Sequence, residues 1–190
     1  MTVSHHDILH SMIYLIGGTP RVGKTTLSKI ILQRKGIPFI PADVLTHALD
    51  HAYPQFEVRK GGWEKIPDRF FPYLRRFVES LTFSLSDYVV EGDSFFPEHV
   101  SKLSKEFKVK SIFLGTSDIK LEDILAYSAH DNWVRDKSRE EQEALPNGLV
   151  EMSKMFKLEA EKYQIPYVDM AIDREKRLEE AYTHLFGESS

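Results

Sequence analysis

The residues with the clearest chemistry form the run from Gly18 to Thr25, which reads Gly-Thr-Pro-Arg-Val-Gly-Lys-Thr. It matches the pattern G-x-x-x-x-G-K-[ST] at every fixed position. The glycines let the backbone curl so that successive N–H groups point at one anion, and a following helix N-terminus adds partial positive charge. In such a loop Lys24 reaches the β- and γ-phosphates, and the Thr25 hydroxyl lies on Mg²⁺. We therefore predict ATP and Mg²⁺ binding by Gly18, Thr19, Pro20, Arg21, Val22, Gly23, Lys24, Thr25 and Thr26.

The segments on either side of this loop have the expected patterns. The apolar run 12–16 predicts a buried strand before the loop, and residues 24–35 predict a helix after it. Gly36 and Pro38 then end that helix in the usual way. The alternative is a glycine-rich turn between strand and helix without a ligand. A strand, a loop and a helix in this order favour the phosphate-binding interpretation.

Acidic residues follow two further predicted strands. Asp43 comes after the second strand, and Glu91 and Asp93 come after the third. Parallel sheets place their sites at the carboxyl ends of strands, so these side chains are expected near the phosphates. We interpret Asp43 as the general base and Glu91 as a Mg²⁺ ligand, as phosphoryl transfer requires. The alternatives are a helix N-cap for Asp43, a solvated turn for Glu91, and either a substrate contact or a turn for Asp93.

Arginine can stabilise the charge that builds up on a transferred phosphoryl group. Arg135 and Arg139 are four residues apart in the polar segment 130–148, which we call the lid-like segment. On a helix they would share one face, and closure of a lid would bring them to the site. The alternative is a salt-bridged solvent helix, because acidic residues stand at 140, 141 and 143. Arg69, Arg75 and Arg76 are candidates for binding an anionic acceptor, with surface positions as the alternative.

Strand-like and helical patterns alternate along the whole chain, which favours an α/β fold with a parallel sheet. The predicted strands are 12–16, 37–41, 87–90, 110–115 and 166–169, and the predicted helices are 24–35, 42–52, 70–85, 149–163 and 174–186. Segments 53–68 and 130–148 do not read as core. Such insertions in a compact domain are usually functional loops or lids.

Composition narrows the class of protein. The 190 residues are 42% hydrophobic and 28% charged, which is typical of one globular domain over 1–190. The net charge of -4 disfavours nucleic acid as the main partner. The chain has no cysteine, which excludes disulfides and Cys-based sites. No signal peptide or membrane-length apolar run is visible, so we expect a cytoplasmic protein.

The run Gly17 to Thr26, with the looser pieces Pro41-Ala42-Asp43 and Val89-Val90-Glu91-Gly92, resembles small P-loop kinases. These form the nucleoside monophosphate kinase-like group, with shikimate, gluconate and adenylylsulfate kinases, and the 2-phosphoglycerate kinase-like proteins. The resemblance implies a P-loop NTPase fold: a five-stranded parallel sheet of order 2-3-1-4-5, flanked by helices, with a lid insertion. It also implies that Asp43 contacts or activates the acceptor. The Asp-Gly common in that group is Glu91-Gly92 here, and the lid-like segment differs from the short Arg-rich lid of nucleotide kinases.

The leading hypothesis is an ATP-dependent kinase that moves the γ-phosphate to a hydroxyl or phosphate of a small-molecule acceptor. Its catalytic residues would be Lys24, Asp43, Arg135 and Arg139, with Thr25 and Glu91 at the metal. One alternative is a regulatory NTPase or switch, but the chain has no Asn/Thr-Lys-x-Asp run and no added domain. Another is a toxin-like kinase of nucleotide sugars or polynucleotide ends. We expect a monomer or homodimer with no membrane partner.

Overall fold

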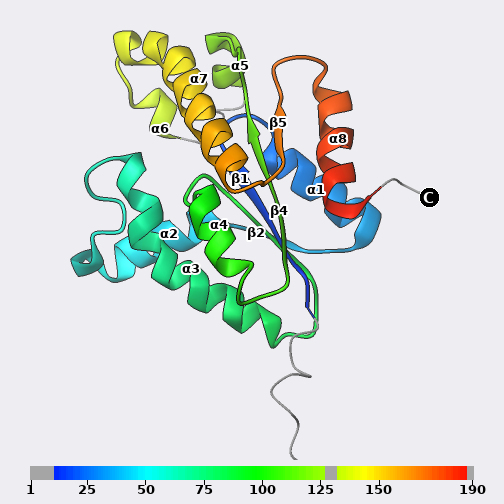
Figure 1. Cartoon of the computed structure of the whole chain (residues 1–190). Helices are drawn as coiled ribbons and strands as arrows, with labels where there is room; N and C mark the ends of the chain where they lie inside the picture. The colour runs from blue at the N-terminus through cyan, green and yellow to red at the C-terminus, as the bar shows by residue number, and fades with distance from the viewer. Residues whose placement is uncertain (1–10, 127–131, 188–190) are drawn as a thin grey trace, which may run out of the picture.

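The computed structural model describes residues 11–126 and 132–187. Five strands form one sheet: β1 (Ile13–Gly18), β2 (Phe39–Pro41), β3 (Tyr88–Glu91), β4 (Val109–Gly115) and β5 (Tyr167–Asp169). Their order is β2-β3-β1-β4-β5, and every pair is parallel. This confirms the predicted sheet and its order. Because β1 lies in the middle, the loop that follows it emerges between the carboxyl ends of β3 and β4 (Figure 1).

Helices cover both faces of the sheet (Figure 1). They are α1 (Lys24–Lys35), α2 (Ala42–Ala52), α3 (Ile66–Thr82), α4 (Pro97–Leu103), α5 (Leu121–Ala126), α6 (Asn132–Arg135), α7 (Arg139–Lys162) and α8 (Arg174–Phe186). Two short 3-10 helices, η1 (Pro54–Phe56) and η2 (Trp63–Lys65), lie between α2 and α3. Among the described residues, none of the helices is both long enough and apolar enough to span a bilayer.

The side chains of β1 show how the two layers are held. Tyr14 and Ile16 pack on the face covered by α1 and α8, whereas Ile13 and Leu15 pack on the face covered by α3, α4 and α7. Successive side chains of a strand point to opposite faces, so one buried strand serves both cores. Each fully buried Leu or Ile contributes about 2 kcal/mol by leaving water. The carboxyl end of β1 is therefore a rigid place from which to start a loop.

A third and smaller apolar cluster lies apart from these cores. It joins Ile124 of α5, Val134 of α6 and Leu149 of α7, with Ile119 and Leu145 against them. The charge pattern of the lid-like segment suggested that none of it would pack as core, and Val134, which is fully buried, corrects that expectation. Residues 130 and 131 of the segment lie outside the described residues.

The helix bounds agree with the sequence patterns at α1, α2 and α8 and differ at α3 and α7. Helix α3 begins at Ile66, because Pro67 fits the first turn, and ends at Thr82. Helix α7 begins at Arg139 instead of residue 149. The polarity of residues 130–148 assigned them to the lid-like segment, but Ser138 and Glu141 form a capping box that starts the helix earlier. The short helices α4, α5 and α6 were not predicted.

Candidate active site

The loop between β1 and α1 has the backbone that its sequence requires. Gly18 has φ 120°, and a Cβ atom there would lie 1.9 Å from the carbonyl oxygen of Leu114 on β4. Gly23 has φ 110° and precedes the first turn of α1, where N–H groups are unpaired within the helix. Arg21 also has a positive φ, of 68°. The loop therefore presents a helix N-terminus and a tight turn, which together suit an anion.

Lys24 lies across the mouth of this loop. Its Nζ donates to the carbonyl oxygens of Gly18, at 3.0 Å, and Thr19, at 2.7 Å. Only 8% of the residue is exposed. These two bonds to backbone carbonyls hold the ammonium group at the loop, where its charge can meet a phosphate.

Thr25 and Glu91 meet beside Lys24. The Thr25 hydroxyl donates to Glu91 Oε1 at 2.8 Å. Glu91 is the last residue of β3, paired in register with Ile16, and is buried. Burial raises the pKa of its carboxyl, while the positive charge of Lys24 and the bond from Thr25 lower that pKa. The predicted metal pair is thus brought together by the parallel register of β1 and β3.

A hydroxyl and a carboxylate are the hard oxygen donors that Mg²⁺ prefers, so Thr25 and Glu91 fit the predicted ion. Within residues 11–126 and 132–187, no group of three or more His, Asp or Glu side chains could hold a metal by itself. Mg²⁺ usually keeps several waters and shares substrate phosphates with one or two carboxylates. A metal at this place would therefore depend on the nucleotide for part of its coordination.

Asp43 is the second residue of α2, and the N-cap of this helix is Pro41. The structure therefore gives Asp43 another role than the N-cap. Its Oδ1 accepts a hydrogen bond from Ser94 Oγ at 3.1 Å. The close packing of Gly92 on α2 brings the β3–α4 turn here, since a Cβ on Gly92 would lie 2.9 Å from the Cβ of Ala42.

The surroundings of Asp43 also change its titration. Desolvation raises the pKa of its carboxyl to about 7, the negative charge of Asp93 adds to this rise, and Lys24 opposes it. The residue is nevertheless open to solvent on one side. A carboxyl group that is crowded by protein but reachable, with a pKa near neutrality, is suited to general-base work.

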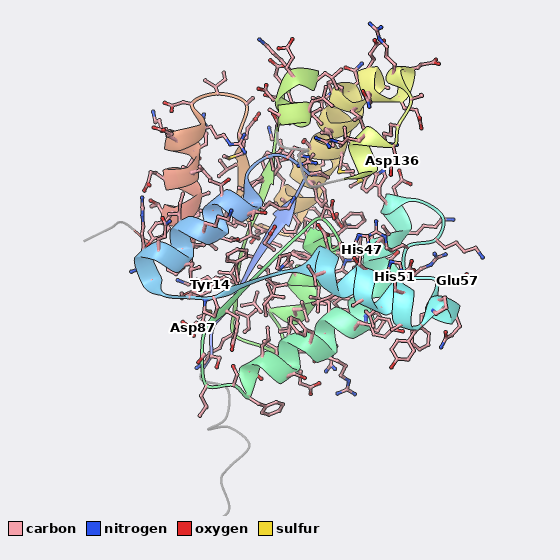
Figure 2. All side chains as sticks on the ribbon, turned by 180° about the vertical axis from the view of Figure 1, so that it is seen from behind. Tyr14, His47, His51, Glu57, Asp87 and Asp136 are labelled. Atoms are coloured by element: carbon pink, nitrogen blue, oxygen red, sulfur yellow. The ribbon has the colours of Figure 1, made fainter. Side chains whose placement is uncertain are left out.

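Other predicted residues lie at the surface. Thr26 is exposed in the first turn of α1, as Thr25 is, and Arg135 is exposed at the end of α6. The side chain of Arg139 is 92% exposed and pairs with Glu143 at 2.9 Å. Figure 2 shows Asp136, between α6 and α7, above His47 and His51 of α2. The lid-like segment thus stands over α2, with Arg139 in the surface pairing that the alternative interpretation described.

The three arginines considered for an anionic acceptor all have partners within the protein. Arg69 donates to the backbone carbonyls of Glu57, at 2.8 Å, and Lys60, which fixes the loop before α3. Arg75 pairs with Glu106. Arg76 pairs with Glu79 at 2.7 Å. Each guanidinium therefore has a structural partner on or near α3.

One feature of the site was missed by the sequence reasoning. A cavity of about 210 Å³ opens beside the loop, lined by Arg21, Val22, Thr116, Asp118, Ile119, Asp123, Met170, Ala171 and Arg174. Arg174 begins α8 and lies near Gly23, since a Cβ there would be 3.1 Å from its guanidinium. The signal was present, because Arg174 follows closely after the fifth strand and so belongs to the same edge of the sheet.

The fold has relatives among solved structures, although no protein-family model and no curated protein matches the sequence. A shikimate kinase from Bacteroides thetaiotaomicron superposes with a TM-score of 0.59 at 15% identity, covering 90% of this chain and 96% of that one. A shikimate kinase from Acinetobacter baumannii, in complex with shikimate, gives 0.55 at 14% identity, covering 94% of both chains. An uncharacterised protein from Eubacterium ventriosum gives 0.54 at 18% identity, covering 94% of this chain and 100% of that one. The chain therefore shares the P-loop fold of these kinases, with the same five-stranded parallel sheet.

Proposed function

We propose that the protein is a kinase that transfers the γ-phosphate of ATP to a hydroxyl or phosphate group of a small molecule. The observation that carries this proposal is the convergence of Lys24, the Thr25–Glu91 pair and Asp43 at neighbouring strand ends. A loop that only binds nucleotide needs the first two. A carboxylate with a raised pKa, open to solvent beside them, is what transfer to an acceptor adds.

Each residue has a distinct role in the proposed reaction. Asp43 accepts the proton of the acceptor hydroxyl. The oxygen of that hydroxyl forms a bond to the γ-phosphorus, and the bond between this phosphorus and the leaving ADP oxygen breaks. Lys24 stabilises the negative charge on the phosphate oxygens. Thr25 and Glu91 would hold Mg²⁺, which supplies further charge stabilisation when bound. Arg135 and Arg139 would reach the phosphate only when the lid-like segment closes.

The cavity beside the loop is a candidate for the nucleoside end of ATP. It lies between Val22 of the loop and Met170 after β5, and it is also lined by Arg21 and Arg174. Apolar side chains could pack on a base, while the charged groups of Arg21, Arg174 and Asp118 could meet its polar atoms or the ribose. This assignment leaves the side of the loop that carries Asp43 for the acceptor.

The test measures ADP release from Mg·ATP with and without pooled fractions of small metabolites. A kinase releases ADP only with certain fractions, and Asp43→Asn loses that release while it still binds nucleotide. Glu91→Gln should instead require more Mg²⁺ for the same rate. ADP release that is independent of every fraction, and unaffected by Asp43→Asn, would show a regulatory NTPase instead.

A further inference from the structure

Ser153, in the middle of α7, is the centre of a buried polar cluster that adjoins the phosphate-binding loop. Its Oγ lies 2.7 Å from Thr19 Oγ1, 2.9 Å from the backbone nitrogen of Thr116, and 2.8 Å from the carbonyl oxygen of Leu149. The hydroxyl of Tyr167 on β5 also bonds to it. Ser153 is 1% exposed and Thr19 is 0% exposed. We call these residues the Ser153 cluster.

The hydrogen-bond capacity of one hydroxyl fixes most of the directions. A serine has one proton to give and two lone pairs to accept with. Ser153 donates to the Leu149 carbonyl, which is the common back-bond of a helical serine, and accepts from the Thr116 N–H. Thr19 Oγ1 and Ser153 Oγ share a further hydrogen bond, in which either hydroxyl could be the donor. The side chain of Thr19, in the phosphate-binding loop, is thereby bonded to α7, which is far away in the sequence.

Thr19 is held at three points, and the third of them is Lys24. Its N–H donates to Leu114 O at 3.0 Å, its hydroxyl contacts Ser153, and its carbonyl accepts from Lys24 Nζ at 2.7 Å. A shift of Thr19 therefore moves an oxygen that orients the Lys24 amine. The route from Ser153 to Lys24 consists of two hydrogen bonds and one residue.

We propose that Ser153 is a positioning residue for phosphate binding, which acts through Thr19 to set the place of Lys24. This inference rests on the proposed function, because it assigns Lys24 to the β- and γ-phosphates. Removal of the Ser153 hydroxyl leaves the buried Thr19 hydroxyl and the Thr116 N–H without this partner. A buried polar group without a partner is costly, so Thr19 should shift toward a new partner. Because Thr19 belongs to the phosphate-binding loop, this shift would displace the loop.

The experiment compares Ser153→Ala with a control variant by calorimetric titration of Mg·AMP-PNP and of AMP, below the melting temperature of each variant. Ser153→Ala should weaken AMP-PNP binding about 5- to 10-fold, the usual effect of one net hydrogen bond. AMP, which lacks the β- and γ-phosphates, should bind within about twofold of wild type. A purely structural role would weaken both ligands alike.

The control removes a comparable buried hydroxyl elsewhere. Thr82→Val deletes a 1% exposed hydroxyl that donates to Glu79 O at 2.7 Å, at the far end of α3. This variant should have a lower melting temperature and an unchanged AMP-PNP affinity. Thr19→Val combined with Ser153→Ala should cost no more affinity than the larger single effect.

A second readout separates this inference from the proposed function. In the protein without nucleotide, amide hydrogen exchange of residues 19–22 should be faster in Ser153→Ala than in wild type and unchanged in Thr82→Val. Equal exchange and equal AMP-PNP affinity in Ser153→Ala and wild type would overturn the positioning role. Failure of wild type to bind AMP-PNP at all would overturn the kinase proposal, and the role of Ser153 in phosphate binding with it.

Discussion

The phosphate-binding loop and the lid-like segment carry the same kind of residue in opposite situations. Lys24 is buried and donates to two backbone carbonyls of its own loop. Arg139 is almost fully exposed, and Glu143 is its partner on the same helix. The first cation is placed by the fold before any ligand arrives. The second cation would reach the site only after the lid-like segment closes. Its ion pair with Glu143 would oppose this little, because an exposed pair of this kind contributes only about 0.5 kcal/mol.

The largest expected effect tests the side of the loop that faces the acceptor. Asp43→Asn should lower the turnover number by about 10²–10⁴-fold, the usual span for a general base. Nucleotide affinity should change less, because the hydrogen-bond partner of the Asp43 carboxylate is Ser94, outside the phosphate-binding loop. In wild type, turnover should rise with pH through about 7, as Asp43 loses its proton. Steady-state kinetics across pH 5 to 9 checks both statements, and a variant with full activity would exclude Asp43 as the base.

The next effect tests the preorganised cation. Lys24→Ala should lower turnover by about 10²–10³-fold, as for the loss of one fixed donor to a developing charge. Far-ultraviolet circular dichroism should show the same helix content as wild type, because Lys24 bonds to the loop and does not pack in either apolar core. An unfolded variant would mean that the two carbonyl bonds hold the loop itself.

A smaller effect is expected from the cations of the lid-like segment. Arg135→Ala and Arg139→Ala should each lower turnover about tenfold while nucleotide affinity changes less, because the contact forms mainly in the transition state. Arg177→Ala is the matched control, since Arg177 also pairs with a glutamate on its own helix. Proteolysis within residues 133–145 should slow when AMP-PNP and the acceptor are both present. Wild-type kinetics for both variants, with ligand-independent proteolysis, would mark this stretch as a surface helix.

The smallest effect concerns stability and pH. The pKa of Asp43 is raised from 3.8 to about 7, so the folded state holds this proton more tightly than the unfolded state. Wild type should therefore lose stability relative to Asp43→Asn as pH rises from 4 to 8. The difference should reach about 1 kcal/mol, after a discount for the solvent that reaches the residue. Urea unfolding of both proteins at pH 4 and pH 8 measures it, and a difference independent of pH would contradict the raised pKa.

The sequence predicted the elements whose signals are local. The bounds of α1 follow from the loop before it and Gly36 after it, and the strands follow from short apolar runs. The predicted start of α7 was wrong because the polar stretch before residue 149 was assigned to the lid-like segment, although Ser138 and Glu141 form a capping box there. The side chains that α7 buries all follow Pro146, so hydrophobic periodicity could not reveal the first turns of this helix.

The candidate site divides in the same way. The loop residues were found from one contiguous motif, and the Thr25–Glu91 contact from strand order. The partners of Asp43 and the contact between Ser153 and Thr19 join residues 51 and 134 positions apart. No spacing rule covers such distances, because the three-dimensional packing of α7 and of the β3–α4 turn creates them. Tertiary contacts of this kind must be seen in the structure.

Pro146 gives α7 two mechanically different halves. Its ring nitrogen has no proton for the carbonyl four residues earlier, so the helix is easiest to bend there. The half after it is held in place, because Ser153 accepts a hydrogen bond from the backbone nitrogen of Thr116, directly after β4. The half before it, residues 139–145, is about 10 Å long, so a bend of about 20° at Pro146 would move its N-terminus by about 3 Å. A bend at Pro146 would therefore move Arg139 while Lys24 stays in its loop, and the packing of Leu145 on the cluster of Ile124, Val134 and Leu149 would oppose it.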